Sequence, residues 1–492
     1  MYILGFDVGS SSVKASLLDA ATGKCLATAF QPRQEMPIIA AKPGWAEQEP
    51  STWWKNLQLA LADVLQQARI DTADIKSIGI SYQMHGLVIV DREGRVLRPS
   101  IIWCDSRSVE IGNAAFASMG TERCLSSLLN SPGNFTASKL KWVQQNEPEI
   151  YRKIDKVMLP GDFIAARMTG DIKTTISGLS EGIFWDFQKN ELSELVLHEY
   201  GIDRDRIPVI TPTFAIQGLL SQQAAGELGL KAGTPVSYRA GDQPNNAFSL
   251  NVLNPGEIAA TAGTSGVVYG VSDVVKYDPQ SRVNTFAHVN HSAAETRLGI
   301  LLCVNGTGIL NSWLKKNMAG DLDYNQMNGL ASPIPIGCEG LTILPFGNGA
   351  ERMLGNRDSG CRISGINFNV HHKAHVLRAA QEGIVFSFTY GIEIMKAIGI
   401  QPSVIRAGNA NMFLSPVFKE ALATSTGATI ELYDTDGSRG AALASGLGAG
   451  IYKSFGEAFQ HLKKLETVYP DDSKRNAYRD AYHVWNDQLK SI

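Results

Sequence analysis

The chain has 492 residues, of which 44% are hydrophobic and 19% are charged, a composition that excludes collagen-like, coiled-coil and low-complexity proteins. Its 45 Lys and Arg residues against 48 Asp and Glu residues give a net charge of −3. No run of basic residues stands out, so we expect neither nucleic acid nor a membrane surface as a partner. The length is too great for one hydrophobic core and predicts two large domains or about three smaller ones, with a cleft between lobes.

The first residues and the cysteines indicate the compartment. Residues 1–7 hold no basic segment ahead of the first acidic residue, and no later stretch reaches the roughly 18 consecutive apolar residues of a membrane span. The six cysteines are scattered without a CxxC pair, which favours reduced thiols over a disulfide framework or a zinc site. We therefore expect a cytoplasmic protein.

Short apolar runs separated by turn residues predict an antiparallel meander at the N-terminus. The runs cover residues 2–6, 13–18 and 25–30. A helix is expected after Ser51, a good N-cap residue, because the apolar residues that follow recur on one helical stripe. Residues 75–81 then form another predicted strand.

Alternating strands and helices follow and predict α/β architecture. Predicted strands at 156–159, 235–239 and 403–406 each precede a helix or a glycine turn, which indicates parallel crossovers attached to the meander. A weak internal echo accompanies this pattern, since residues 256–271 repeat the strand, Gly/Ser/Thr turn and strand of the opening. The echo predicts two related lobes.

We place the lobe boundary near residues 246–253. The predicted domains are therefore 1–246 and 247–492.

Asp7 and the turn after it form the first candidate site. An acid at the end of a buried strand is costly unless it is paired, and here it precedes the small residues Gly9, Ser11 and Ser12 and then Lys14. Backbone N–H groups of such a turn can cradle an anion, which suits phosphate and Mg²⁺. The alternative is a plain hairpin in which Asp7 caps the turn.

A second turn of the same kind lies far along the chain, at Gly263, Thr264 and Ser265, again between two apolar runs. Two such hairpins could close on one polyphosphate from opposite lobes. The alternative is a pair of unrelated hairpins.

Asp242, followed by Gln243, stands directly after the predicted strand at 235–239. The carboxyl end of such a strand is where α/β proteins place reactive groups. In a kinase this carboxylate would accept the proton of the attacking hydroxyl, whereas an N-cap role is the structural alternative.

Polar and aromatic residues suited to a polyol occur in two segments. Gln83, Met84 and His85 lie in one, and Trp103 and Asp105 lie in the other, which continues to Arg107. A hairpin with a satisfied histidine and a surface Asp–Arg pair would explain the same residues.

Three further patterns are weaker. Gly408 and Asn409 lie in a turn between a strand and a helix, where backbone could approach a nucleotide. Residues 178–182 fit GxSxG, but no hydrophobic strand precedes them, so we expect a loop rather than a hydrolase elbow. The histidines near residue 372 read as the polar start of a helix.

At this point the chain resembles the FGGY carbohydrate kinases, and within them most closely the xylulokinases. The likeness runs nearly end to end. Its motifs include residues 7–14, 44–50, 83–86, 103–107, 139–143, 241–242, 263–266, 344–352 and 381–383.

The resemblance implies two RNase H-like domains, related to those of actin and Hsp70, with ATP and sugar meeting in the cleft. It implies Asp242 as general base and Asp7 at the Mg²⁺–phosphate end. Phosphate contacts are implied for the turns at residues 9–14 and 263–265, and adenosine contacts for Gly408 and Asn409. It also implies that residues 83–85, 103, 105 and 243 form the sugar site.

The sequence departs from the xylulokinase pattern at residues 243–246 beside the base, at 407–410 near the adenosine and at 350–354. The second family signature is also off pattern, at Cys361 and Gln381. The resemblance therefore predicts an ATP-dependent kinase of a small ketose or related polyol without fixing the sugar. An actin- or Hsp70-like binding or regulatory protein is the alternative. A homodimer is compatible with the resemblance, and the sequence does not decide the oligomeric state.

Overall fold

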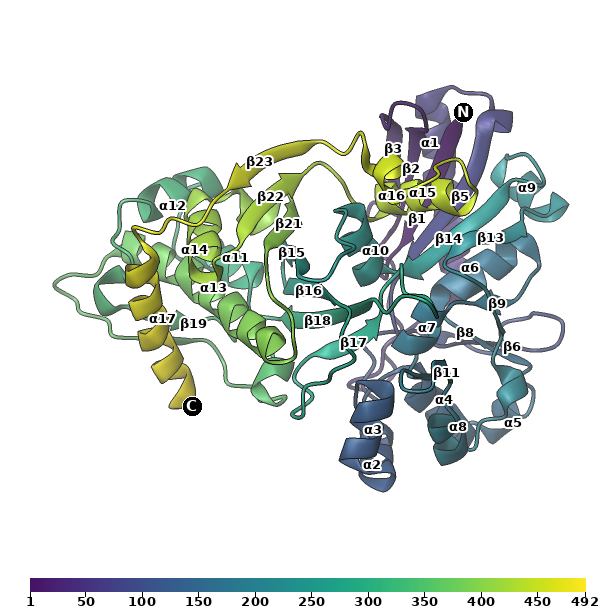
Figure 1. Cartoon of the computed structure of the whole chain (residues 1–492), viewed down its shortest axis with the longest axis horizontal. Helices are drawn as coiled ribbons and strands as arrows, with labels where there is room; N and C mark the ends of the chain where they lie inside the picture. Colours follow the sequence, from purple (N-terminus) through teal and green to yellow (C-terminus); the bar gives the residue numbers. More distant parts are fainter. The chain divides into compact units, whose positions relative to one another are not determined.

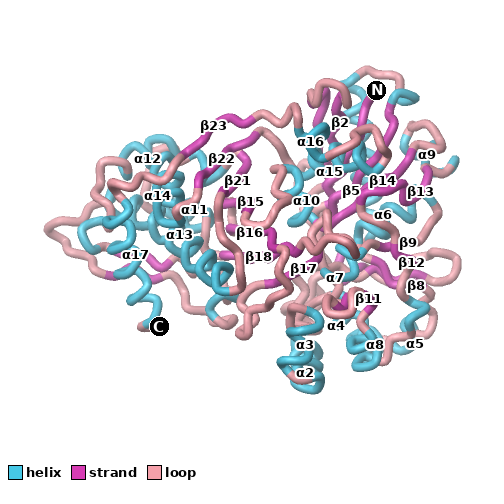
Figure 2. Tube along the Cα trace, in the orientation of Figure 1, coloured by secondary structure: helices cyan, strands magenta, loops and turns pink.

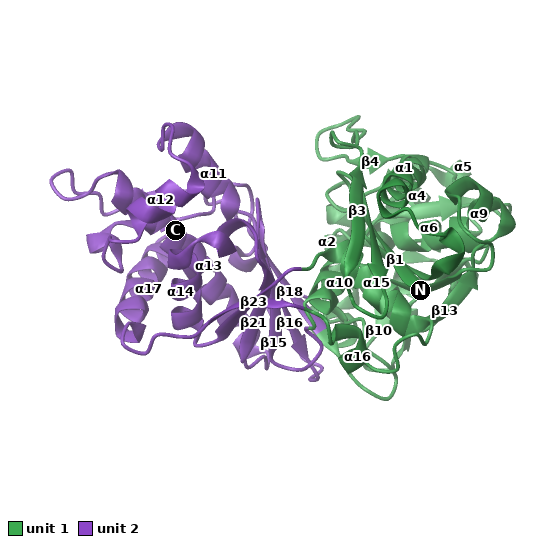
Figure 3. Cartoon of the chain, turned by 90° about the horizontal axis from the view of Figure 1, so that it is seen from above, with its two compact units in different colours: residues 1–251, 286–298, 435–462 green, residues 252–285, 299–434, 463–492 purple.

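The structure, a computed structural model, describes residues 1–492 throughout, and its contacts separate the chain into two units (Figure 3). Unit 1 comprises Met1–Asn251, Phe286–Leu298 and Thr435–Leu462, and unit 2 comprises Val252–Thr285, Gly299–Asp434 and Lys463–Ile492. This division differs from the expected domains 1–246 and 247–492, because two later segments return to unit 1. None of the helices has the length and apolar character that crossing a membrane requires.

Unit 1 is built on a six-stranded sheet (Figure 1). In spatial order its strands are β13 (Phe214–Leu219), β14 (Pro235–Gly241), β5 (Ile75–Tyr82), β1 (Tyr2–Val8), β2 (Val13–Asp19) and β3 (Cys25–Gln31). β1 and β3 both pair antiparallel with β2, while β1 also pairs parallel with β5, and β5 with β14. The predicted meander and the predicted strands at 75–81 and 235–239 are therefore confirmed.

Helices cover both faces of this sheet. Successive residues of a strand point to opposite faces, and in β1 Leu4 and Phe6 share a buried apolar cluster with α1 and α6, while Gly5 faces α15. The helices of unit 1 are α1 (Pro50–Ala68), α2 (Val109–Met119), α3 (Thr121–Leu128), α4 (Thr136–Asn146), α5 (Pro148–Tyr151), α6 (Pro160–Thr169), α7 (Ile176–Glu181), α8 (Glu194–Tyr200), α9 (Gln222–Leu228), α10 (Asp242–Ser249), α15 (Gly437–Gly448) and α16 (Phe455–Phe459).

Helix α15 explains why a late segment of the chain belongs to unit 1. A Cβ atom at Gly5 would overlap the Ser438 carbonyl oxygen, and one at Gly79 would overlap the Ala441 carbonyl oxygen. Both glycines are needed because the helix backbone lies almost directly on β1 and β5. Two buried hydrogen bonds at 2.8 Å hold it there, Ser16 Oγ with Ser438 Oγ, and Ser237 Oγ to the Ser445 carbonyl.

Unit 2 repeats the opening of unit 1. The sheet that carries most of unit 2 contains, in spatial order, β17 (Asn284–Ala287), β18 (Leu298–Val304), β16 (Gly266–Ser272), β15 (Glu257–Ala262), β21 (Val404–Gly408), β22 (Thr429–Tyr433) and β23 (Lys464–Val468). The end of β17, Phe286 and Ala287, and Leu298 at the start of β18 are grouped with unit 1. β15 pairs antiparallel with β16 and parallel with β21, as β1 does with β2 and β5. The internal echo in the sequence is therefore a repeated sheet plan.

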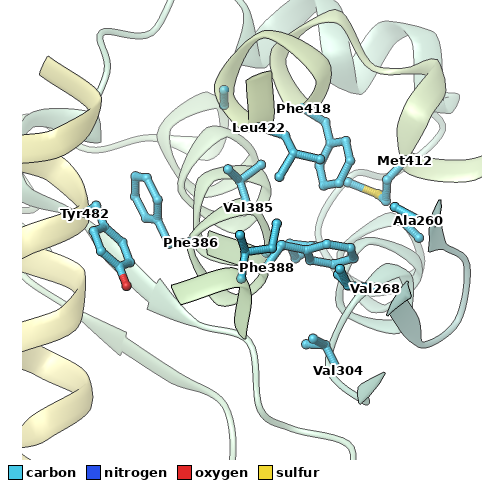
Figure 4. Close-up of a cluster of buried hydrophobic side chains, with 14 of the residues drawn as sticks. Ala260, Val268, Val304, Val385, Phe386, Phe388, Met412, Phe418, Leu422 and Tyr482 are labelled. Atoms are coloured by element: carbon cyan, nitrogen blue, oxygen red, sulfur yellow. The ribbon is translucent and has the colours of Figure 1, made fainter. Parts of the chain in front are cut away.

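The core of unit 2 lies between this sheet and its helices (Figure 4). Phe388 and Val385 of α13 meet Phe418 and Leu422 of α14 there, beside Val268 of β16. The helices of unit 2 are α11 (Gly308–Asn317), α12 (Tyr324–Ala331), α13 (Lys373–Ala397), α14 (Pro416–Thr426) and α17 (Arg475–Lys490).

Short elements occupy the connections (Figure 2). The strand pairs are β4 (Glu47–Gln48) with β7 (Ser100–Ile101), β6 (Val88–Val90) with β8 (Lys156–Met158), β9 (Lys173–Thr174) with β12 (Val209–Ile210), β10 (Trp185–Asp186) with β11 (Glu191–Leu192), and β19 (Thr342–Leu344) with β20 (Arg362–Ser364). Single 3₁₀ turns occur at Thr72–Asp74, Arg204–Arg206, Cys338–Gly340, Arg352–Leu354 and Asn411–Leu414.

Two local predictions need correction. α1 begins at Pro50, ahead of the predicted N-cap Ser51, because proline suits the first position of a helix. Residues 178–182 are not a loop: most of them form α7, whose N-cap Thr175 accepts a hydrogen bond from the Gly178 N–H at 3.0 Å. The predicted polar helix start is confirmed, since α13 is capped at His372.

The contact between α15 and the sheet of unit 1 yields a stability prediction. Gly79→Ala should lower the free energy of unfolding by about 2 kcal/mol, because the added methyl group would push the Ala441 backbone away from β5. Gly226→Ala, in the exposed part of α9 where nothing lies near the added methyl group, should instead raise it by about 0.5–1 kcal/mol. Urea unfolding followed by fluorescence measures both, and equal stabilities of the two variants would contradict the close packing.

Candidate functional site

Asp7 lies at the end of β1, where unit 1 gathers several polar groups. Its Oδ1 accepts a hydrogen bond from Ser81 Oγ at 2.8 Å, and its Oδ2 lies so close to Gly437 that a side chain there would overlap it. Burial raises the pKa of Asp7, the Ser81 hydrogen bond opposes this, and the nearby Asp436 carboxylate raises it further. The Asp7 carboxylate is therefore held in one place with a high affinity for a positive partner.

Lys14 stands opposite Asp7 on β2 and pairs with a residue that the sequence analysis missed. Its Nζ donates to Asp436 Oδ2 at 2.8 Å, while Asp436 Oδ1 caps α15 by accepting from the Ser438 and Arg439 N–H groups. Burial acts to raise the pKa of Asp436, but Lys14 and the hydrogen bonds from Ser438 and Arg439 together outweigh it, so the pKa is lowered. An Asp-Gly-Ser sequence ahead of an alanine-rich stretch is an N-cap signal, yet its nearness to Lys14 is visible only in the fold.

Asp242 is the first residue of α10, directly after β14. Burial, together with the negative charge of Asp7, raises its pKa to about 7, although the backbone N–H of Gln243 opposes this. Asn245 ties α10 to α15 by donating from Nδ2 to the Gly437 carbonyl at 2.8 Å. The carboxylates of Asp7 and Asp242 thus act on each other, and Asp242 is poised to take up a proton near neutral pH.

Gln83 and Trp103 converge on the turn after β1. The Gln83 side chain is 2% exposed and donates from Nε2 to Gln48 Oε1 at 3.3 Å, while its own Oε1 has no partner in the protein. Trp103 is 52% exposed and donates from Nε1 to Ser10 Oγ at 3.3 Å. These two side chains therefore border the turn from two sides.

Gln48, which was not among the predicted site residues, connects the turn after β1 to Gln83. Its Nε2 donates to the Ser10 carbonyl at 2.7 Å, and its Oε1 accepts from Trp53 Nε1 at 3.0 Å as well as from Gln83. One buried amide therefore fixes the turn and Gln83 together. Its place in the motif at 44–50 was visible in the sequence, but its partners were not.

The carboxylate of Asp105 is buried and bonded to protein groups. It is fully buried, its oxygens accept from Arg107 and from the Ala46 N–H, and Arg107 is stacked 3.8 Å from the Trp45 ring centroid. This arrangement occupies Asp105 in holding the loop that carries Trp103.

His85 has an unusual backbone, with φ of +60°, and a well-fixed ring. Its Nδ1 lies 2.9 Å from the Glu181 carbonyl oxygen, and the ring packs against Phe135 and Phe286 with centroids 4.8 and 5.2 Å away. The buried Lys139 donates from Nζ to the His85 carbonyl at 2.8 Å, and burial lowers its pKa to about 7. Met84, the preceding residue, packs against Gly241 beside Asp242.

Unit 2 contains a pocket of about 580 Å³ next to the turn between β15 and β16. Gly263 and Thr264 line it, as predicted for phosphate contacts, whereas Ser265, Gly408 and Asn409 lie outside its lining. Its polar lining also includes residues that the sequence analysis missed, namely Asn311, Ser312, Lys316, Asn325, Asn328 and Asn411. A pocket of this volume lies within the range of small-molecule sites.

The start of α11 fixes one wall of this pocket. The N–H groups of Gly308 and Ile309 donate to the carbonyls of Gly263 and Thr264 at 2.8 and 3.0 Å. A Cβ atom at Gly308 would overlap the Gly263 carbonyl oxygen, so the helix approaches the turn as closely as glycine allows. These hydrogen bonds use the first N–H groups of α11, so the helix start holds the turn at Gly263 and Thr264 in place.

The chain was compared with known proteins. Residues 2–249 match the profile of the N-terminal domain of the FGGY family of carbohydrate kinases. Xylulose kinase of Escherichia coli K12 is 30% identical over 488 residues, which cover 97% of this chain and 96% of the relative.

Two solved structures share the fold over their full length. Xylulose kinase from Rhodospirillum rubrum superposes with a TM-score of 0.90 at 24% identity, and covers 100% of this chain and 99% of its own. Plasmodium falciparum glycerol kinase with ADP gives a TM-score of 0.88 at 22% identity, with 100% and 98% covered. The predicted α/β fold of the actin-like ATPase type, with two sheets in two domains, is thereby confirmed.

The raised pKa of Asp242 predicts a pH-dependent gain in stability on neutralising it. The native protein binds the Asp242 proton up to about pH 7, whereas the unfolded chain releases it near 3.8, so ionised Asp242 costs the native state stability as the pH rises between these values. At pH 8 the free energy of unfolding of Asp242→Asn should therefore exceed that of the wild type by up to about 4 kcal/mol. The gain should vanish towards pH 4.

Chemical denaturation at several pH values, in buffer free of divalent cations, measures this difference. Asp19→Asn is the matched control, because hydrogen bonds from the Thr22 backbone lower the pKa of Asp19 and its ionised form stabilises the fold. A pH-independent effect of Asp242→Asn would show that this carboxylate is not perturbed.

Proposed function

Because this chain belongs to the FGGY family of carbohydrate kinases, we propose that it transfers the γ-phosphate of ATP to a hydroxyl of a small ketose or related polyol, xylulose-like, with Asp242 as the general base. Asp242 carries the proposal. It begins α10 at the carboxyl end of β14, and its pKa of about 7 lets it take a proton and release it again near neutral pH.

In the proposed reaction Asp242 accepts the proton of the sugar hydroxyl as that oxygen attacks the γ-phosphorus. Met84 and His85 lie on the adjoining segment, with Gln83 and Trp103 beyond them, and these side chains with Gln243 would bind and orient the sugar. Gln83 Oε1 has no protein partner but is buried, so a sugar hydroxyl would reach it only after a local movement of this segment. Catalysis of phosphoryl transfer rests mainly on such positioning and on neutralising charge.

The nucleotide would occupy the pocket of unit 2, with its phosphates at Thr264. Within unit 1, the turn formed by Gly9, Ser11 and Ser12 beside Lys14 is of the kind that binds phosphate. Asp7 suits the Mg²⁺–phosphate end, because Mg²⁺ is usually held by one or two carboxylates together with waters and substrate phosphates. No cluster of three or more acidic, histidine or cysteine ligands exists, which agrees with such an open site rather than a closed protein cage. A bound Mg²⁺ would supply neutralisation of the phosphate charge.

Replacing the base tests the proposal directly. Asp242→Ala should lower kcat at least roughly 10²-fold, because the hydroxyl proton would lose its acceptor, while the affinity for ATP should stay within about threefold of wild type. The measurement is coupled ADP production with Mg·ATP across a panel of ketoses, aldoses, sugar acids and polyols. Nucleotide titration gives the affinity for ATP separately.

A reaction without sugar is the control for that panel. Turnover with one panel member that Asp242→Ala abolishes would support both the reaction and the base. ADP release that no sugar increases, in a protein that binds ATP, would contradict sugar phosphorylation within the panel and favour a nucleotide-driven binding protein. Wild-type turnover by Asp242→Ala would remove Asp242 from the mechanism alone.

The pocket of unit 2 gives a separate prediction for ATP. Gly308→Ala should raise the KM for ATP roughly 10-fold and leave the KM for the sugar within about twofold, because the added methyl group displaces the Gly263 carbonyl and with it Thr264. Gly329→Ala in α12, where the methyl group meets open space, is the matched control. Initial rates with varied ATP and saturating sugar measure the effect, and an unchanged KM for ATP would place the nucleotide elsewhere.

A further inference from the structure

Glu181, the last residue of α7, is a buried acid to which the proposed reaction gives no role. It is 1% exposed, and neither carboxylate oxygen has a partner in hydrogen-bonding geometry. Burial raises its pKa well above 4.5; the nearby Tyr82 hydroxyl opposes this, and the charges of Asp242 and Asp162 reinforce it. A buried carboxyl group is costly unless it is well paired, and here only the Tyr82 hydroxyl stands near it, so its presence requires a physical reason.

The carboxyl group of Glu181 fills the space beside Gly241, the residue before Asp242. A Cβ atom built on Gly241 would lie 2.6 Å from Glu181 Oε2 and 2.6 Å from Met84 Cγ. Gly241 has φ of −57°, which any residue can adopt, so glycine is required here for space rather than for backbone freedom. Glu181 and Met84 therefore pack directly on the Gly241–Asp242 junction.

The backbone of the same residue holds the sugar-side histidine. The Glu181 carbonyl lies 2.9 Å from His85 Nδ1, and when Nδ1 carries the proton this contact fixes the orientation and tautomer of the ring. Lys139 Nζ binds the His85 carbonyl at 2.8 Å, so both the ring and the backbone of His85 are fixed.

Helix α7 is itself firmly anchored. Its Ser177 Oγ donates to the Ala287 carbonyl at 3.1 Å, and Ser180 Oγ accepts from the Ala287 N–H at 2.9 Å. Both Ala287 and α7 belong to unit 1. Helix α7 therefore holds Glu181 in place. The Glu181 side chain packs on Gly241, next to Asp242, and its backbone carbonyl contacts His85.

We infer that Glu181 is a positioning residue of sugar phosphorylation: its carboxyl group packs against Gly241 and its carbonyl orients His85, so that the attacking hydroxyl and Asp242 are held in register. The inference rests on the proposed function. It assigns to Glu181 no contact with the sugar and no proton transfer. Its consequence is that the shape of the Glu181 side chain, rather than its charge, matters for the reaction.

Substitutions of Glu181 test shape against charge. Glu181→Ala should lower kcat/KM for the sugar about 30- to 100-fold, mainly through kcat, because a displacement of about 1 Å at reacting groups can cost roughly 10²-fold. The KM for ATP should stay within about twofold. Glu181→Gln keeps the shape without the charge and should remain within about threefold of wild type in kcat/KM.

Asp186→Asn is the matched control, since Asp186 is a buried carboxylate five residues further on whose Oδ1 accepts from the Gln188 and Lys189 N–H groups. It should change thermal stability without separating kcat from KM. Melting temperatures of all variants identify any general loss of folding.

Gly241→Ala supplies a reciprocal test. In the wild-type background the added methyl group meets Glu181 Oε2, so kcat should fall about as much as in Glu181→Ala. In the Glu181→Ala background the clash with Glu181 is removed and only the one with Met84 remains, so the same substitution should cost less than it does in the wild-type background. Such non-additivity is expected only of residues in contact.

The outcomes distinguish the proposed kinase function from the positioning role of Glu181. Absence of sugar-dependent turnover in the wild-type protein would overturn the proposed function and this inference with it. Wild-type kinetics of Glu181→Ala, additive effects with Gly241→Ala, or a Glu181→Gln variant as impaired as Glu181→Ala would each overturn the inference while the kinase reaction stands. If Glu181→Ala does not fold, the other two variants test the inference. Glu181→Gln should then keep a near-wild-type kcat, and Gly241→Ala should have a lowered kcat.

Discussion

The close approach of α15 to the sheet of unit 1 is the constraint on which the candidate site depends. Gly5 and Gly79 let the helix backbone reach β1 and β5, and this contact sets the position of the helix start. Asp436 is thereby brought to Lys14, and Gly437 to Asp7 and Asn245. A glycine contact in the middle of the sheet therefore fixes the carboxylates at its edge, because a helix transmits its position rigidly along its length.

The same region contains ionisable groups whose charged forms are destabilised by burial. Burial raises the pKa of Asp242 to about 7 and lowers that of Lys139 to about 7, so each group is less willing to carry its charge than it would be in water. A folded protein tolerates such groups only because the surrounding packing is strong enough to hold them. Unit 1 supplies this packing through its apolar cluster beneath β1 and β5.

Patterns that are local in the sequence could be predicted, and contacts between distant segments could not. The meander, the repeated hairpin at β15 and β16, and the position of Asp242 after β14 follow from hydrophobic runs and turns. Asp436 and Gln48 bind partners far away in the chain, so no spacing rule reveals them. Glu181 lies within the GxSxG match, for which the sequence predicts a loop. Thr175 is a residue type that caps helices, so α7 could have been predicted there, but the burial of the Glu181 carboxyl group could not.

The segmented nature of unit 1 has a consequence for how the chain reaches its native state. The strands β1, β2, β5 and β14 are all synthesised early, yet the helix that covers one face of their sheet comes from Thr435–Leu462. Until that late segment has left the ribosome, the glycine-lined face of the sheet has nothing to pack on. Closing such a long loop carries an entropic cost that local contacts do not offset. Unit 1 is therefore not an autonomous N-terminal piece that could be cut out at residue 251, and in assembling its native state the chain behaves as a whole.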